Sequence, residues 1–214
     1  MLASETQHRQ ECLCHVVSTT GLSSYFVDTR LRRVPASPLF VFENRWQQRQ
    51  VHALVGRLPP MSGAPVRIGK ERGLRDRRGP VHAGAWLRER SIRFDCTKAE
   101  FPRIFVHELF HFVWLRAGNP VRRAFGELLR AERAAGARGE LGCSAEWRKE
   151  QLEARDVAAR SRRWREYCCE SFCDTAAWLY SGAGRHEEFT LAARFRERRR
   201  SWFRETLEAK ALLI

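Results

Sequence analysis

The feature that most constrains this chain is an apolar stretch, residues 101–116, that carries two histidines and a glutamate. Its central residues, His-Glu-Leu-Phe-His, run from His107 to His111 and place the two imidazoles four residues apart. On a helix, residues four apart lie one turn above each other on the same face. The two imidazoles can therefore bind one metal ion, and Glu108 can reach a water molecule beside that ion.

The surrounding residues predict that this stretch is a helix inside a hydrophobic core, because apolar side chains fill it nearly all round. We place its start near Glu100, since Pro102 then falls in the first turn, where its missing N–H does no harm. Burying two histidines and a glutamate among apolar residues costs free energy unless they have partners. A metal ion is one such partner, and hydrogen bonds from the histidines to backbone groups are the alternative.

Length and composition favour one α+β domain, residues 1–214. A chain of 214 residues is long enough for one domain with a sizeable core, and we expect no second complete domain. The hydrophobic share of 43% is typical of a globular protein. We expect a strand-rich N-terminal part, residues 1–98, and a helical part, residues 99–214, that carries the metal site. No apolar run follows Met1 and none is long enough to span a bilayer, so we expect a soluble, cytoplasmic protein.

Local patterns predict the elements before the motif. Residues 38–43 and 66–68 are typical of strands, and Asn44 is typical of a helix N-cap. Residues 84–96 divide into two short strands, a hairpin that leads into the motif helix. If this pair has an exposed edge, an extended peptide substrate can add to it through backbone hydrogen bonds. The alternative is an ordinary hairpin that packs beneath the helix.

The segments after the motif are predicted to be helical. Asn119 is a candidate N-cap for a helix over residues 121–135. Residues 144–180 contain no proline or glycine and are long for one straight helix, so we expect a second helix start near Ser161. A last helix is expected over residues 188–212.

The net charge of +14 comes almost wholly from arginine. Such an excess favours nonspecific contact with polyanions such as nucleic acids. The run Arg196 to Arg200 is predicted to be a solvated helix face, with polyanion binding as the alternative.

The chain has seven cysteines, an odd number, and no export signal, so we expect reduced thiols rather than disulfides. A separate structural metal site, formed by Cys12, Cys14 and His15 with a later cysteine, is the alternative to buried free thiols.

A catalytic zinc site takes three protein ligands, so the third must come from elsewhere in the chain. We predict Glu170, because Glu170 and Asp174 lie four apart on one helical face whose small residues allow close packing. Asp174 is then placed to accept a hydrogen bond from the free N–H of a ligating histidine. Three other glutamates and two cysteines remain as alternatives for the third ligand: Glu146, Glu150, Glu166, Cys168 and Cys169.

The pattern His107-Glu108-x-x-His111, with Glu170-x-x-x-Asp174 on a later segment, resembles the gluzincin branch of the zincin metallopeptidases. The small size and the strand pair before the motif are similar to the minimal ImmA/IrrE-type peptidases. The resemblance covers about residues 84–180, whereas the N-terminal third departs from that group and no helix-turn-helix is recognisable.

This resemblance implies a zincin-like fold, in which a small mixed sheet lies across the active-site helix. It implies a zinc ion held by His107, His111 and Glu170, and hydrolysis of a peptide or protein substrate with Glu108 as general base. Tyr167, Tyr180 and His186 are candidate donors to the oxyanion of the reaction. Two alternatives are a zincin scaffold without turnover, serving a regulatory or nucleic-acid-associated role, and a helical structural protein in which the motif is accidental.

Overall fold

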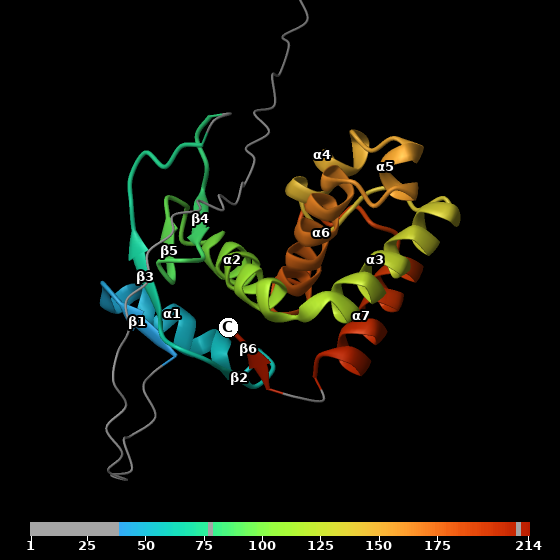
Figure 1. The fold of residues 1–214 in the computed structure, drawn as a ribbon. Coiled ribbons are helices and arrows are strands. Elements are labelled where there is room, and N and C mark those ends of the chain that lie inside the picture. The colour runs from blue at the N-terminus through green and yellow to red at the C-terminus, as the bar shows by residue number, and fades with distance from the viewer. Residues whose placement is uncertain (1–38, 77–78, 209–210) are drawn as a thin grey trace, which may run out of the picture.

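The computed structural model describes residues 39–76, 79–208 and 211–214. Within them the protein is α+β, with a small mixed sheet followed by a mostly helical C-terminal half (Figure 1). The short strands expected within residues 12–27, and the candidate ligands Cys12, Cys14 and His15, lie outside the described residues.

The first described elements are β1 (Phe40–Phe42) and α1 (Arg45–Val55). The helix begins where the sequence predicts, because the Asn44 side chain accepts a hydrogen bond from the Gln47 N–H at 2.9 Å. α1 connects β1 to the next strand of the sheet and packs against both β1 and the central helix described below.

Four strands form the main sheet, in the order β1-β3-β5-β4. β3 (Val66–Lys70) runs parallel to β1, and β5 (Ser91–Phe94) runs parallel to β3. β4 (Ala83–Trp86) is antiparallel to β5, which confirms the predicted hairpin. β4 lies at the end of the sheet, and no strand in the described part of the chain pairs with its outer side.

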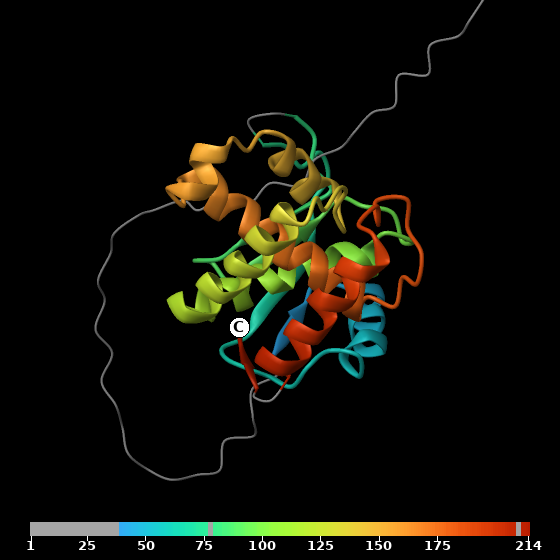
Figure 2. The same ribbon diagram turned by 90° about the vertical axis from the view of Figure 1, so that its right-hand side faces the viewer.

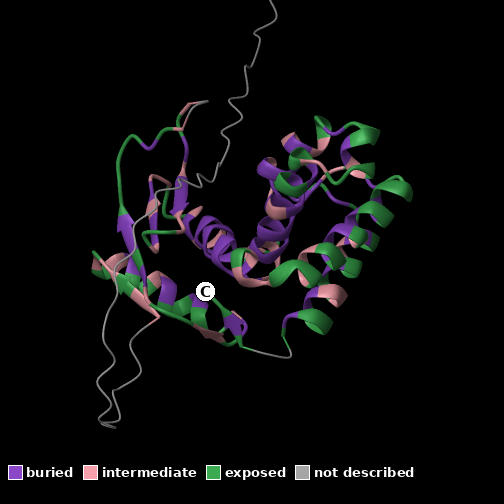
Figure 3. Ribbon diagram, viewed as in Figure 1, coloured by how far each residue is buried: buried purple, intermediate pink, exposed green. Residues whose placement is uncertain are grey.

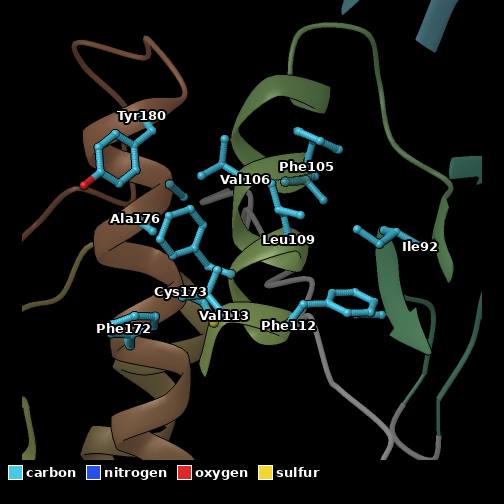
Figure 4. Close-up of a cluster of buried hydrophobic side chains, with 14 of the residues drawn as sticks. Ile92, Phe105, Val106, Leu109, Phe112, Val113, Phe172, Cys173, Ala176 and Tyr180 are labelled. Carbon is cyan, nitrogen blue, oxygen red and sulfur yellow. The ribbon is translucent and has the colours of Figure 1, made fainter. Parts of the chain in front are cut away.

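α2 (Phe101–Arg116) is the central element of the molecule, and it begins directly after Glu100, as predicted. It packs on the sheet on one side and on α6 (Arg162–Tyr180) on the other, so it is buried nearly all round (Figures 1 and 3). Figure 4 shows the apolar layer that joins these elements, with Phe112 on α2 and Phe172 on α6. The uniformly apolar composition of α2 is explained by this position between two packed surfaces.

α3 (Gly118–Ala134) follows α2 after a single residue, Ala117. The prediction that Asn119 caps this helix is wrong, because the helix begins before Asn119 and no side-chain hydrogen bond from the described residues caps it. Gly118 has a φ of 72°, in the left-handed region that glycine adopts without strain. The chain therefore changes direction at Gly118 without the short loop that a side-chain cap requires.

The stretch without proline or glycine forms three helices rather than two. α4 (Cys143–Glu150) and the short α5 (Ala154–Ala158) precede α6. α6 starts at the predicted point, because the Ser161 hydroxyl oxygen accepts a hydrogen bond from the Trp164 N–H at 3.3 Å. α4 and α5 both pack against α6.

The last helix, α7, spans Ala193–Thr206. Figure 2 shows α7 in red, and this helix packs against α3. α7 is shorter than predicted and ends before residue 212. The end of the chain instead forms β6 (Leu212–Leu213), which runs parallel to β2 (Met61–Ser62). The C-terminal segment is thereby tied to the N-terminal part of the fold.

Arg199 contradicts the prediction that the run Arg196 to Arg200 is a solvated face. Its side chain is 0% exposed and lies 2.7 Å from Glu132 Oε2 and 2.7 Å from Glu140 Oε2. In a helix that packs on a core, about one residue in every three or four faces that core, so five consecutive residues cannot all be solvated. Arg199 occupies such a position on α7, and two carboxylates there compensate its buried charge.

Candidate metal centre

His107 and His111 meet on one side of α2, as their four-residue spacing requires. Their rings are 4.9 Å apart between centroids, the two Nε2 atoms are 3.2 Å apart, and both side chains are buried. Nitrogen ligands lie about 2.0–2.1 Å from a tetrahedral zinc ion, which separates two of them by about 3.3 Å. The two histidines are therefore spaced as ligands of one ion.

Glu170 brings a carboxylate from α6 to the same point. Its Oε2 atom lies 3.3 Å from His107 Nε2, and one donor atom from each of His107, His111 and Glu170 falls within 4.8 Å of the others. Oε2 is buried, and His107 is the one partner that lies within ion-pair distance of it among the described residues. A buried carboxylate oxygen with so few partners is costly, and a cation bound between it and the two nitrogens would reduce that cost.

Asp174, one turn beyond Glu170 on α6, contacts the other side of the His107 ring. Its Oδ1 atom lies 2.7 Å from His107 Nδ1, at the position predicted for a partner of a ligating histidine. In the neutral ring, this contact assigns the proton to Nδ1 and leaves the lone pair of Nε2 directed at the cluster, as metal binding requires. The other carboxylate oxygen, Oδ2, accepts a hydrogen bond from the Ala145 N–H at 3.1 Å.

Glu108 is buried beside these groups, with 1% of its surface exposed. Burial raises its pKa, while His107 and His111 act in the opposite direction. A carboxylate with a raised pKa is suited to accept and return a proton near neutral pH, which agrees with the predicted role of general base.

The charges of the cluster are strongly coupled. Burial alone would lower the pKa of His107, but Asp174 and Glu170 raise it well above its ordinary value. Burial alone would raise the pKa of Glu170, but Arg148 and the two histidines lower it to about 2. The Glu170 carboxylate is therefore ionised at neutral pH, as a metal ligand must be.

Arg148, on α4, is a buried cation at the cluster that sequence reasoning did not identify. Its Nη2 atom lies 3.3 Å from Glu170 Oε1, and its guanidinium lies against the Trp147 ring at 5.6 Å from the centroid. α4 packs against α6, and this contact brings Arg148 to Glu170. No pattern in the sequence could have revealed it, because Arg148 is one of many arginines and its partner is distant in the chain.

Two thiols occupy the outer side of His111. Cys169 Sγ and Cys173 Sγ each lie 3.4 Å from His111 Nδ1. The hydrogen bond from Cys173 and the neighbouring His111 lower the pKa of Cys169 to about 6, although burial opposes this change. The alternative prediction was that the motif histidines form hydrogen bonds with backbone groups. The structure differs, because Nδ1 of His107 contacts Asp174 and Nδ1 of His111 contacts the thiols.

The other glutamates considered as third ligand lie away from the histidines. Glu166 is exposed and pairs with Arg162 at 2.7 Å, Glu146 contacts Thr190, and Glu150 is exposed. Cys168 faces Gly126 on another side of α6. The structure thus brings together five predicted site residues, whose roles remain predictions: His107, Glu108, His111, Glu170 and Asp174.

The three candidate oxyanion donors are all engaged elsewhere. Tyr167 donates a hydrogen bond to Glu140 and Tyr180 donates one to Glu208. His186 Nε2 lies 3.3 Å from a carboxylate oxygen of Glu100. Arg148 Nη2, in contrast, lies at the cluster itself, 3.3 Å from Glu170 Oε1.

Comparison with protein-family models, with curated proteins and with solved structures finds no match to this chain. Among the residues that the structure describes, no helix combines the length and the apolar composition needed to cross a bilayer. Conclusions about function therefore depend on the geometry of the cluster.

Proposed function

We propose that this protein is a zinc-dependent metallopeptidase with a zincin-like fold. The observation that carries the proposal is the buried Oε2 of Glu170, 3.3 Å from His107 Nε2, beside two Nε2 atoms at the separation of tetrahedral ligands. Two histidines and one carboxylate are the donor set of many catalytic zinc sites, and three protein ligands leave a position for the reactant.

Zinc bound by His107, His111 and Glu170 would supply a Lewis acid and lower the pKa of water at the site. Glu108 would accept the proton of the attacking water and pass it to the leaving amine. Asp174 would hold His107 in the tautomer that presents Nε2. Arg148, already placed beside Glu170, would stabilise negative charge that develops on the substrate oxygen.

The edge strand β4 supports an extended peptide as the substrate. The Asp95 N–H donates a hydrogen bond to the His82 carbonyl oxygen at 2.7 Å, so these two residues form a hydrogen-bonded pair of the antiparallel ladder. Such pairs alternate along the ladder, which turns the backbone groups of Ala83 and Ala85 toward the outer edge. β4 also packs on α2, the helix that carries the two histidines. A peptide added to this edge would lie along the strand next to the metal centre.

The proposal is tested with the full-length protein, purified without chelators, by metal analysis and by hydrolysis of a mixture of fluorogenic peptides. We expect one zinc ion at this centre per chain, and we expect Glu108→Gln to retain zinc and lose hydrolysis. Glu127→Gln, at an exposed glutamate on α3, is the matched control and should behave as the unmutated protein. Hydrolysis that persists in Glu108→Gln, or zinc that persists in a His107→Ala, His111→Ala variant, would contradict the proposal.

A cavity on the helical half favours a second candidate function, binding of an anionic polymer. Trp114 and Trp164 line this cavity of about 540 Å³ together with four arginines: Arg122, Arg123, Arg160 and Arg165. Trp164 is buried, so the partly exposed Trp114 ring would offer a surface for base stacking, and the arginines would contact phosphates, as in binding of a single-stranded nucleic acid. Oligonucleotide binding that weakens steeply with salt, falls in Arg123→Ala and is unchanged in Glu108→Gln would support this function. Binding that is insensitive to Arg123→Ala would contradict it.

A further inference from the structure

Cys169, Cys173 and His111 form a second group of donor atoms next to the first. The two cysteines are four residues apart on α6, so both sulfurs project from the same face of the helix. Each sulfur lies 3.4 Å from the same atom, His111 Nδ1, and the three donor atoms fall within 4.8 Å of one another. Cys173 is buried, whereas Cys169 is partly exposed and connects the group to solvent.

The separations match those around a metal ion. With zinc–sulfur bonds of about 2.3 Å and zinc–nitrogen bonds of about 2.0–2.1 Å, a tetrahedral ion separates a sulfur from a nitrogen ligand by about 3.6 Å. Both observed sulfur–nitrogen distances are within a few tenths of an ångström of that value. A single ring nitrogen makes one well-aligned hydrogen bond, whereas a metal ion would engage both sulfurs and the nitrogen at once.

We propose that His111 Nδ1, Cys169 Sγ and Cys173 Sγ form a second metal position, selective for thiophilic ions such as Cd²⁺ or Cu⁺. Thiolates favour these softer ions, while the nitrogen and oxygen donors of His107, His111 and Glu170 favour zinc. As the ion binds, each sulfur that still carries a proton releases it to solvent, and both thiolates bind the metal. This inference goes beyond peptide hydrolysis and does not require that the protein be a peptidase.

The two positions exclude each other because they share one imidazole. A neutral imidazole has one nitrogen with a free lone pair, and the other nitrogen carries the proton. When Nε2 of His111 binds an ion beside His107, Nδ1 carries the proton and cannot be a ligand. When Nδ1 binds an ion between the thiols, Nε2 carries the proton and leaves the first position with one histidine fewer. A thiophilic ion would therefore withdraw His111 from the zinc centre.

Cadmium titration of the metal-free full-length protein tests the second position. Cadmium uptake is followed by the ultraviolet charge-transfer absorption of cadmium–thiolate bonds and by metal analysis. We expect the Cys169→Ser, Cys173→Ser variant to lose the cadmium–thiolate absorption of the unmutated protein, even where an ion still binds at the first position. Cys168→Ser is the control, because Cys168 is the neighbouring residue and faces Gly126 instead of His111. Equal cadmium–thiolate absorption by the double variant and the unmutated protein would overturn the proposal, as would an equal loss in Cys168→Ser.

Two further measurements test the second position without relying on the fold of the double variant or on an intact zinc centre. Cadmium nuclear magnetic resonance of the unmutated protein should show one ion with two sulfur ligands, and a spectrum without such an ion would overturn the proposal. Glu170→Gln, which disables the first position, should keep the cadmium–thiolate absorption. If this variant loses zinc and hydrolysis but keeps the cadmium–thiolate absorption, the two sites are independent. Failure of the peptidase proposal can then be distinguished from failure of this one.

Mutual exclusion is tested by counting all ions bound when zinc and cadmium are both supplied in excess. We expect the unmutated protein and the Cys169→Ser, Cys173→Ser variant to hold the same total, because the shared imidazole serves one ion at a time. One additional ion in the unmutated protein would show that both positions fill together and would overturn the exclusion.

Discussion

Gly142 lies against the carboxylate of Asp174, so closely that a Cβ atom at position 142 would fall 2.3 Å from Asp174 Oδ1. No other side chain could therefore occupy position 142 without moving Asp174 or the backbone before α4. The same backbone segment supplies the Ala145 N–H that bonds to Asp174 Oδ2. The position of His107 in the cluster thus depends on a glycine that is far from it in sequence.

Gly142→Ala is expected to weaken zinc binding by about tenfold or more, because it displaces the carboxylate that orients His107. Zinc affinity is measured by competition with a chromophoric chelator. Gly184→Ala is the matched control, since a Cβ atom there meets nothing within 4 Å. Equal zinc affinities of the two variants would contradict the role given to Gly142.

Asp174→Asn is expected to reduce zinc affinity by about 10- to 100-fold with little change in fold, because the amide keeps the shape of the carboxylate but not its charge. The measurement is again competition with a chelator, with circular dichroism to verify the fold. Glu127→Gln removes an exposed carboxylate on α3 and should leave the affinity unchanged. If Asp174→Asn bound zinc as tightly as the unmutated protein, Asp174 would not be orienting a metal ligand.

Arg148→Met, assayed at saturating zinc, is expected to lower kcat by about 100-fold, because it removes a cation that stabilises charge on the reacting oxygen. Arg148→Lys should restore part of the rate, since it returns the charge without the planar guanidinium. Both are measured with whichever peptide the unmutated protein hydrolyses. A change in KM with unaltered kcat would show that Arg148 binds substrate without acting on the transition state.

Glu140→Gln is expected to destabilise the protein by about 3–5 kcal/mol near neutral pH, because it breaks a buried ion pair with Arg199. Burial would raise the pKa of Glu140, but Arg199 and Lys149 lower it to about 2, below the ordinary value of 4.5. The stabilisation is therefore complete above about pH 4.5 and is lost progressively as the pH falls toward 2.

Urea unfolding at about pH 7 and about pH 3 measures this dependence, and the difference between Glu140→Gln and the unmutated protein should shrink at the lower pH. Glu127→Gln, whose partners Arg130 and Arg160 are exposed, should cost at most about 1 kcal/mol at either pH. A difference for Glu140→Gln that is the same at both pH values would show that the Glu140 charge does not contribute.

The elements with strong local signals could be predicted from the sequence. The Asn44 cap, the hairpin of β4 and β5, the start of α2 and the restart at Ser161 all depend on residues within a few positions of one another. Asn119 shows where such signals mislead, because it has the composition of a cap, yet Gly118 turns the chain first. Arg199 shows the same for charge, since a buried arginine cannot be distinguished from its exposed neighbours until its carboxylate partners are known.

The sequence by itself determined that two imidazoles share one helical face and that a glutamate follows the first of them in sequence, because helical periodicity is a local property of the chain. It narrowed the third ligand to a few acidic residues and thiols. The tertiary structure decided which of these reaches the histidines, because that depends on how α6 packs on α2 and α4 packs on α6. The same packing placed Arg148 beside Glu170, Gly142 against Asp174 and two thiols around His111. Contacts between distant segments follow from the shape and burial of whole elements, and no local pattern encodes them.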